Sequence, residues 1–238
     1  MKKKIILITI TLLQLSSFCQ SKTTILDEEG DSIENLIPKE WEILSTSTGD
    51  LNKDGINDLV FAIQNTDKNN FNIHDGPGRD TINLNPRILG IYFRNKNGQL
   101  IKKLQSDKFI ILQDSPTMDE PFDGIEILKN GILKVDFHFW FSAGSWSMSS
   151  HSYKFRFQNE KFELIGYDSS ERHRGTGETT DYRINFSTRK MNISRMTIDE
   201  NDIETVKEES KTFKLDSLKS IQSLGKPFEW EFIKFNEL

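Results

Sequence analysis

The chain has 238 residues and a mass of 27.6 kDa, enough for one large domain or two small ones with a buried core. Its 31 basic and 36 acidic residues leave a formal charge of −5, which argues against the broad basic surface that binds nucleic acid. The sequence holds 17 phenylalanines but only two alanines, so it is rich in an aromatic strand former and poor in the commonest helix former. We therefore expect a mostly β protein with no nucleic-acid partner.

The first 19 residues have the order of a secretory signal peptide. Lys2–Lys4 precede the apolar run Ile5–Leu15, which is followed by Ser16, Ser17, Phe18 and Cys19. The run is shorter than the roughly 20 residues of a transmembrane helix. We predict cleavage near residues 19–21 and an extracytoplasmic mature chain, periplasmic or secreted, without a transmembrane helix. A lipid anchor on Cys19, the only cysteine, is the alternative.

From residue 37 onward the sequence has the pattern of antiparallel sheet. Short apolar runs with period-two alternation are separated by turns rich in Asn, Gly, Asp and Ser. We expect residues 22–238 to form a single all-β domain of antiparallel hairpins, arranged in a propeller-like or a sandwich-like meander. The predicted hairpins pair 88–94 with 99–104, 125–128 with 132–141, 153–157 with 162–167, and 182–186 with 191–193.

Other stretches depart from this pattern. Residues 67–86 and 169–180 are polar and predict two exposed loops. Apolar residues recur every three positions over 215–224 and predict a short C-terminal amphipathic helix that ends at Gly225. The alternating residues Phe228–Phe232 predict a closing strand.

The segment Gly49–Phe61 has the spacing of a calcium loop. Oxygen-bearing side chains fall at its relative positions 1, 3, 5 and 9 counted from residue 50, and Gly55 at position 6 permits a sharp turn. A calcium ion takes about 6–8 oxygen ligands, and this spacing curls the side chains around one point. The predicted ligands are the side chains of Asp50, Asn52, Asp54 and Asp58 and the carbonyl of Ile56. The alternative interpretation is that these Asp, Asn and Gly residues form a polar turn without a metal.

The run Asp50–Leu59 resembles the calcium loop of the FG-GAP and VCBS repeats found in integrin-type β-propellers and many secreted bacterial proteins. An EF-hand is not predicted, because Phe61 takes the position of its bidentate Glu and a strand, not a helix, follows the loop. The resemblance implies that the same five ligands hold calcium in a loop joining two strands of an extracytoplasmic β domain.

Trp140 and Trp146 lie in the aromatic segment Phe137–Trp146. Such rings can lie flat on sugar faces while neighbouring serine hydroxyls donate hydrogen bonds, so both tryptophans are candidate ligand-binding residues. The alternative interpretation is packing in the core, since alternate phenylalanines of this segment share one strand face.

Together these features predict a secreted or periplasmic calcium-binding β protein that acts as a binding or structural module. Its partner is an unidentified protein or glycan. A secreted glycan-active hydrolase and an envelope interaction protein are the alternatives. The four histidines show no metal-ligand spacing and no motif for nucleophilic catalysis, so no catalytic residue is predicted.

Overall fold

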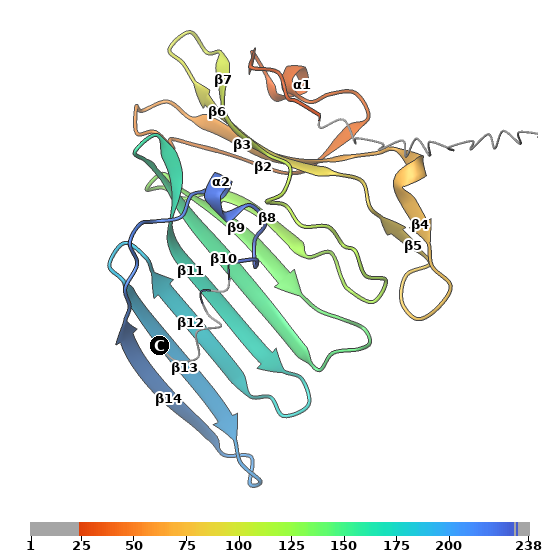
Figure 1. Cartoon of the computed structure of the whole chain (residues 1–238), viewed down its shortest axis with the longest axis vertical. Helices are drawn as coiled ribbons and strands as arrows, with labels where there is room; N and C mark the ends of the chain where they lie inside the picture. Colours follow the sequence, from red (N-terminus) through yellow and green to blue (C-terminus); the bar gives the residue numbers. More distant parts are fainter. Residues whose placement is uncertain (1–23, 231, 233–238) are drawn as a thin grey trace, which may run out of the picture.

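The computed structural model describes residues 24–230 and 232 (Figure 1). Strands make up 51% of the chain and helices 6%, which confirms the all-β class with antiparallel sheets. Within the described residues, no helix is long and apolar enough to cross a membrane. The predicted signal peptide, residues 1–19 with Cys19, lies outside the described residues.

The first part of the chain forms a five-stranded antiparallel sheet in the order β1-β7-β6-β3-β2. The inner strand β3, which lies between β6 and β2, is buried from Asp58 to Gln64, because both of its faces are covered. A short helix, α1 (Ile33–Leu36), packs against the outer face of this sheet through Leu36. The strands are β1 (Glu29–Gly30), β2 (Trp41–Gly49), β3 (Asp58–Asn65), β6 (Arg87–Arg94) and β7 (Leu100–Ser106).

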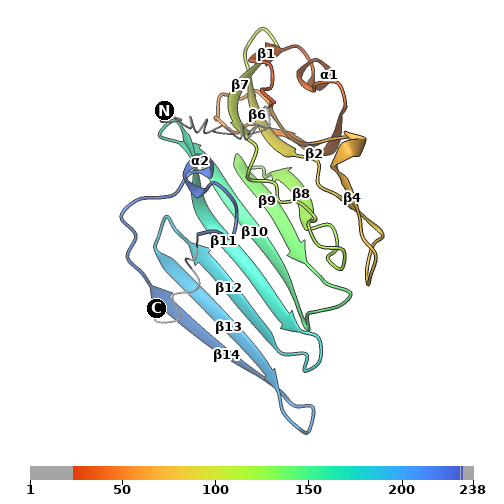
Figure 2. The same ribbon diagram turned by 45° about the vertical axis from the view of Figure 1, so that its right-hand side comes forward.

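The second part forms a seven-stranded antiparallel meander in which every strand pairs with its neighbours in sequence (Figure 2). All four predicted hairpins are confirmed, one as β6–β7 and three within this meander. The strands are β8 (Phe122–Ile127), β9 (Ile132–Phe139), β10 (Ser147–Gln158), β11 (Lys161–His173), β12 (Thr179–Asn185), β13 (Lys190–Ile198) and β14 (Glu204–Thr212).

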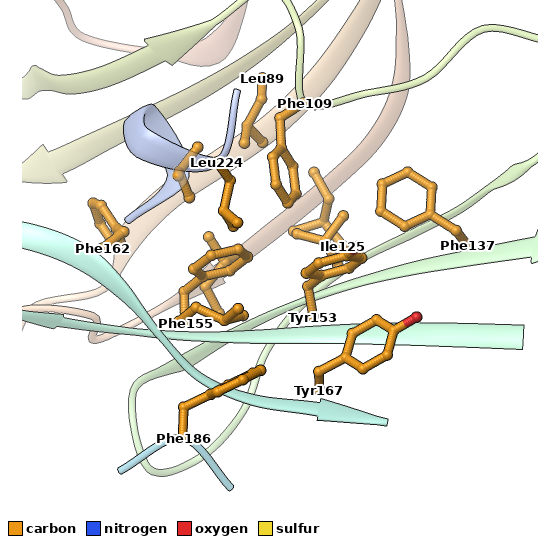
Figure 3. Close-up of a cluster of buried hydrophobic side chains, with 14 of the residues drawn as sticks. Leu89, Phe109, Ile125, Phe137, Tyr153, Phe155, Phe162, Tyr167, Phe186 and Leu224 are labelled. Atoms are coloured by element: carbon orange, nitrogen blue, oxygen red, sulfur yellow. The ribbon is translucent and has the colours of Figure 1, made fainter. Parts of the chain in front are cut away.

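The main core lies between the two sheets (Figure 3). Of the two predicted arrangements, the sandwich-like one is therefore consistent with the structure. Phe109, from the segment between β7 and β8, is fully buried and makes edge contacts with Phe137, Tyr153 and Phe155. At one edge the sheets are joined by side chains: the hydroxyls of Ser45 and Ser47 on β2 accept hydrogen bonds from backbone N–H groups of β8 at 3.1 and 2.9 Å.

Two predicted loops are shorter than expected. Residues 67–86 contain the 3-10 helix η1 (Lys68–Asn70) and an exposed two-stranded ribbon of β4 (Phe71–Ile73) and β5 (Thr81–Asn83). In the second stretch, β11 continues to residue 173 and β12 begins at residue 179. The prediction was wrong there because one face of an antiparallel sheet can be solvated, so polar residues do not by themselves indicate a loop.

The C-terminal predictions are only partly right. The helix is confined to α2 (Ile221–Leu224), where Ser220 and Ser223 form a capping box. Residues just before it stay extended because the carbonyl of Lys219 accepts a hydrogen bond from the Leu164 N–H of β11 at 2.7 Å. Residues 228–230 and 232 form no strand, and their aromatic rings instead pack on the inner face of the seven-stranded sheet.

Replacing Phe109 with alanine should destabilise the protein strongly, since it removes the ring that contacts three aromatic side chains between the sheets. We expect Phe109→Ala to lower the free energy of unfolding by about 3–5 kcal/mol in urea denaturation. Phe71→Ala, which truncates a ring that is 40% exposed in β4, is the matched control and should change it little. Equal losses for the two variants would contradict this account of the core.

Candidate functional site

The loop of residues 50–57 joins β2 to β3 at the place where the two sheets meet. Leu51 in this loop is only 1% exposed and belongs to the main core. On the other side, Gly131 in the β8–β9 turn has a φ of +73°, and a Cβ atom there would lie 2.6 Å from the carbonyl oxygen of Asp50. The loop is therefore packed between the start of β3 and the β8–β9 turn.

Three of the predicted ligands hold the curl of the loop through hydrogen bonds to its own backbone. The carboxylate of Asp50 accepts from the N–H groups of Asp54 and Gly55 at 3.1 and 2.9 Å. The side-chain oxygen of Asn52 accepts from Asp54 N–H at 3.0 Å, and Asp54 accepts from Ile56 N–H at 2.8 Å. Gly55 has a φ of +86°, which favours glycine at the tightest point of the turn. The structure therefore shows a polar turn held by these side chains, and their role as calcium ligands stays a prediction.

Asp58 is the predicted ligand that is fully buried. One carboxylate oxygen accepts from Leu51 N–H at 2.8 Å, and the other accepts from Arg94 N–H of β6 at 3.0 Å. Among the described residues no cationic side chain forms an ion pair with this carboxylate. Burial raises the pKa of Asp58, although the hydrogen bonds from Arg94 and Leu51 oppose the shift, and the nearby charge of Asp54 adds to it.

The side chains of Asp50, Asn52 and Asp54 make hydrogen bonds to other groups of the same loop. The amide of Asn52 donates to the second oxygen of Asp54 at 3.0 Å. In the part of the chain that the structure describes, no group of three or more His, Cys, Asp or Glu side chains is placed to hold a metal ion. The donors nevertheless suit calcium chemically, since carboxylate, amide and backbone oxygens are its usual ligands and each oxygen has two lone pairs. The carbonyl of Ile56, the fifth predicted ligand, accepts no hydrogen bond from another described residue.

The two candidate tryptophans lie in different surroundings. Trp140 is half-buried beneath the guanidinium group of Arg174, 5.2 Å from the ring centre. Trp146 is 68% exposed and lies beside His173. It borders a hollow of about 520 Å³, and Trp140 does not line that hollow; the lining residues are Ser142, Ala143, Gly144, Ser145, Trp146 and Arg174.

The alternative interpretation of the aromatic segment is confirmed for two of its phenylalanines. Phe137 is 1% exposed in the main core, and the ring of Phe139 packs against Phe228. Both rings lie on the inner face of the sheet.

A row of hydrogen-bonded side chains on this inner face was missed from the sequence. His151 contacts the hydroxyl of Tyr167 at 2.7 Å and that of Ser149 at 2.9 Å. Burial lowers the pKa of His151 to about 4, so the ring is neutral at physiological pH and a weak general base. Alternation places Ser149 and His151 on one face of β10, but the pairing with Tyr167 depends on the register between β10 and β11.

Comparison of the chain with protein families, with curated proteins and with solved structures finds no match. The resemblance of Asp50–Leu59 to FG-GAP and VCBS calcium loops therefore stays a prediction.

The raised pKa of Asp58 has a measurable consequence for stability in metal-free buffer. Because the folded state binds the Asp58 proton more readily than the unfolded chain, this group contributes stability at low pH that is lost as pH rises through its folded pKa. The stability advantage of the wild type over Asp58→Asn should therefore grow as pH falls from neutrality toward about 4, the usual range for Asp. Urea titrations at several pH values measure it.

Asp199 is the matched control because its pKa is lowered by hydrogen bonds from Ile203 N–H and Asn201 N–H. The advantage of the wild type over Asp199→Asn should shrink as pH falls through the lowered pKa. If the advantage of the wild type over Asp58→Asn and its advantage over Asp199→Asn changed in the same direction with pH, the account of Asp58 would be wrong.

Proposed function

We propose that this chain is an extracytoplasmic calcium-binding β protein that acts as a binding or structural module. The observation that carries the proposal is the buried Asp58 carboxylate, which has no ion-pair partner among the described residues and closes a loop wound by the other predicted ligands. A bound divalent cation would supply the missing charge. The export part of the proposal is supported by the order of Lys2–Lys4 and the apolar run that follows.

The position of the loop indicates what calcium would do. Asp58 connects the loop to β6 through Arg94 N–H, and Asp50 lies against the β8–β9 turn at Gly131. An ion held by the loop would compensate the charges of Asp54 and Asp58, whose proximity raises the Asp58 pKa. It would therefore stabilise the corner that joins the two sheets. Holding it requires the Asn52 amide to release Asp54, so that the Asp54 carboxylate is free for the ion.

Removing two of the outer ligands should abolish calcium-dependent stabilisation. In chelator-stripped protein, binding to the folded state alone contributes RT ln(1 + [L]/Kd), about 2.7 kcal/mol at a hundredfold excess over Kd. We expect wild type to show calcium binding by calorimetry and a rise in melting temperature, and Asp50→Ala/Asp54→Ala to show neither. Magnesium should substitute poorly, because it demands a smaller octahedral shell and retains its waters.

Asp199→Ala/Asp202→Ala is the control with the same change in charge, since both residues are exposed in the β13–β14 turn. It should respond to calcium as the wild type does. Absence of calcium heat and of any change in melting temperature in the wild type would reject the metal assignment.

Glycan binding at Trp146 is a second candidate function. The exposed ring borders a hollow of about 520 Å³ that also contains Arg174 and two serines. Arg174 is held there by the carbonyls of Phe141 and Ser145 and covers Trp140. The lining residues of this hollow include no carboxylate, so they favour binding of a sugar over its hydrolysis.

Trp146→Ala should weaken binding to a soluble polysaccharide, because it removes the face on which a sugar ring would stack. Affinity electrophoresis against a polysaccharide panel should show a loss of several-fold to roughly tenfold in affinity for any polysaccharide that the wild type binds. Phe71→Ala, which truncates another exposed aromatic ring, is the control and should bind normally. Undiminished binding by Trp146→Ala, or no binding by the wild type, would reject this candidate.

A further inference from the structure

The outer face of the seven-stranded sheet contains a hollow of about 450 Å³ centred on β11. Gly166 lies at its floor, directly opposite Lys154 on β10 and Asn185 on β12. Side chains of the flanking strands surround Gly166, which has no side chain of its own. The hollow therefore lies where a glycine occupies a middle strand of the sheet.

Four cationic side chains line the hollow, and only one of them has a counter-charge. Lys154 forms an ion pair with Asp168, the one acidic lining residue. The remaining three cations, from β10, β12 and β13, form no ion pair and no side-chain hydrogen bond within residues 24–230 and 232; they are Arg156, Arg183 and Lys190. Four positive charges and one negative charge leave +3 in the lining, in a chain whose formal net charge is −5.

We propose that this hollow binds an oxyanion, a phosphate, sulfate or carboxylate group, carried by a saccharide. Guanidinium groups match the planar or tetrahedral oxygens of such groups with paired N–H donors, and Lys190 adds a mobile positive charge. The amide side chains of Asn185 and Asn192 offer further donors in the same lining. Because three of the four cations lack internal partners, a ligand would not have to displace an existing ion pair to reach them.

The saccharide part of the proposal rests on what lies beside the hollow. A second hollow of about 360 Å³ adjoins it and shares Asp168 and Arg183 with it. Four serines line it, and their hydroxyls suit the hydroxyl groups of a sugar ring; they are Ser150, Ser152, Ser169 and Ser170. Neither hollow includes a residue of the 50–58 loop, so this site is independent of the calcium proposal.

The test compares four probes by calorimetry at fixed salt: inorganic phosphate, glucose 6-phosphate, glucuronate and glucose. We expect the wild type to bind glucose 6-phosphate or glucuronate, and to bind the better of them more tightly than either inorganic phosphate or glucose. Arg183→Ala/Lys190→Ala should weaken that binding by roughly tenfold or more, since hydrogen bonds to charged groups are the strong ones. Lys161→Ala/Lys207→Ala removes the same charge from exposed positions outside the hollow and should bind normally.

A second variant separates a built site from general attraction between charges. Gly166→Val fills the floor without changing any charge, and a Cβ atom there meets its nearest neighbours at 3.5 Å, an ordinary contact distance. We expect Gly166→Val to keep the melting temperature of the wild type and to lose binding. Gly166→Ala should bind with intermediate affinity, and it replaces Gly166→Val in the test if the valine destabilises the fold. Normal binding by these variants, or no binding of any oxyanion by the wild type, would overturn the proposal. Equal affinity for inorganic phosphate and both sugars would overturn its saccharide part.

Discussion

Burial of β3 on both faces is the constraint on which the rest of this structure depends. Val60 and Ala62 face the main core, whereas Leu59, Phe61 and Ile63 face the cluster beneath α1 and the N-terminal segment. A strand buried in this way has no solvated face, so polar groups at its ends must find partners inside the protein. Asp58 begins β3 under this constraint, and its carboxylate accepts backbone N–H groups from two different segments.

The arrangement around Asp58 links local loop chemistry to the packing of the two sheets. The same carboxylate fixes Leu51, which is buried in the main core, and β6, which pairs with β3. Burial disfavours its charged form, and a folded protein can offset that cost by neutralising the charge or by binding a cation. A cation held at this point would act on the joint between the sheets, because the adjacent β8–β9 turn has a glycine where any side chain would strike the loop.

The sequence was most informative where structure depends on neighbours along the chain. Turn residues and alternation predicted the four hairpins, and Gly55 predicted the sharp turn in the loop before β3. It was least informative where register or solvation decides. Strand β14 is exposed along nearly its whole length, so it has no apolar periodicity to detect. The cations around Gly166 come from three strands and are brought together only by the register of the meander.

The two faces of the seven-stranded sheet differ in the side chains that they carry. The inner face holds aromatic rings in mutual contact, where each ring is constrained by its neighbours. The outer face holds serines, asparagines and charged groups, and Arg183, Asn185, Lys190 and Asn192 are all exposed. Substitution of exposed side chains changes stability little, so this face can be altered for a new ligand while the fold is kept. The loop at Asp58 has no such freedom, because the carboxylate proposed to hold an ion also closes the buried end of β3. The proposed ligand site on the outer face and the proposed ion site at the corner are therefore subject to different physical limits within one protein.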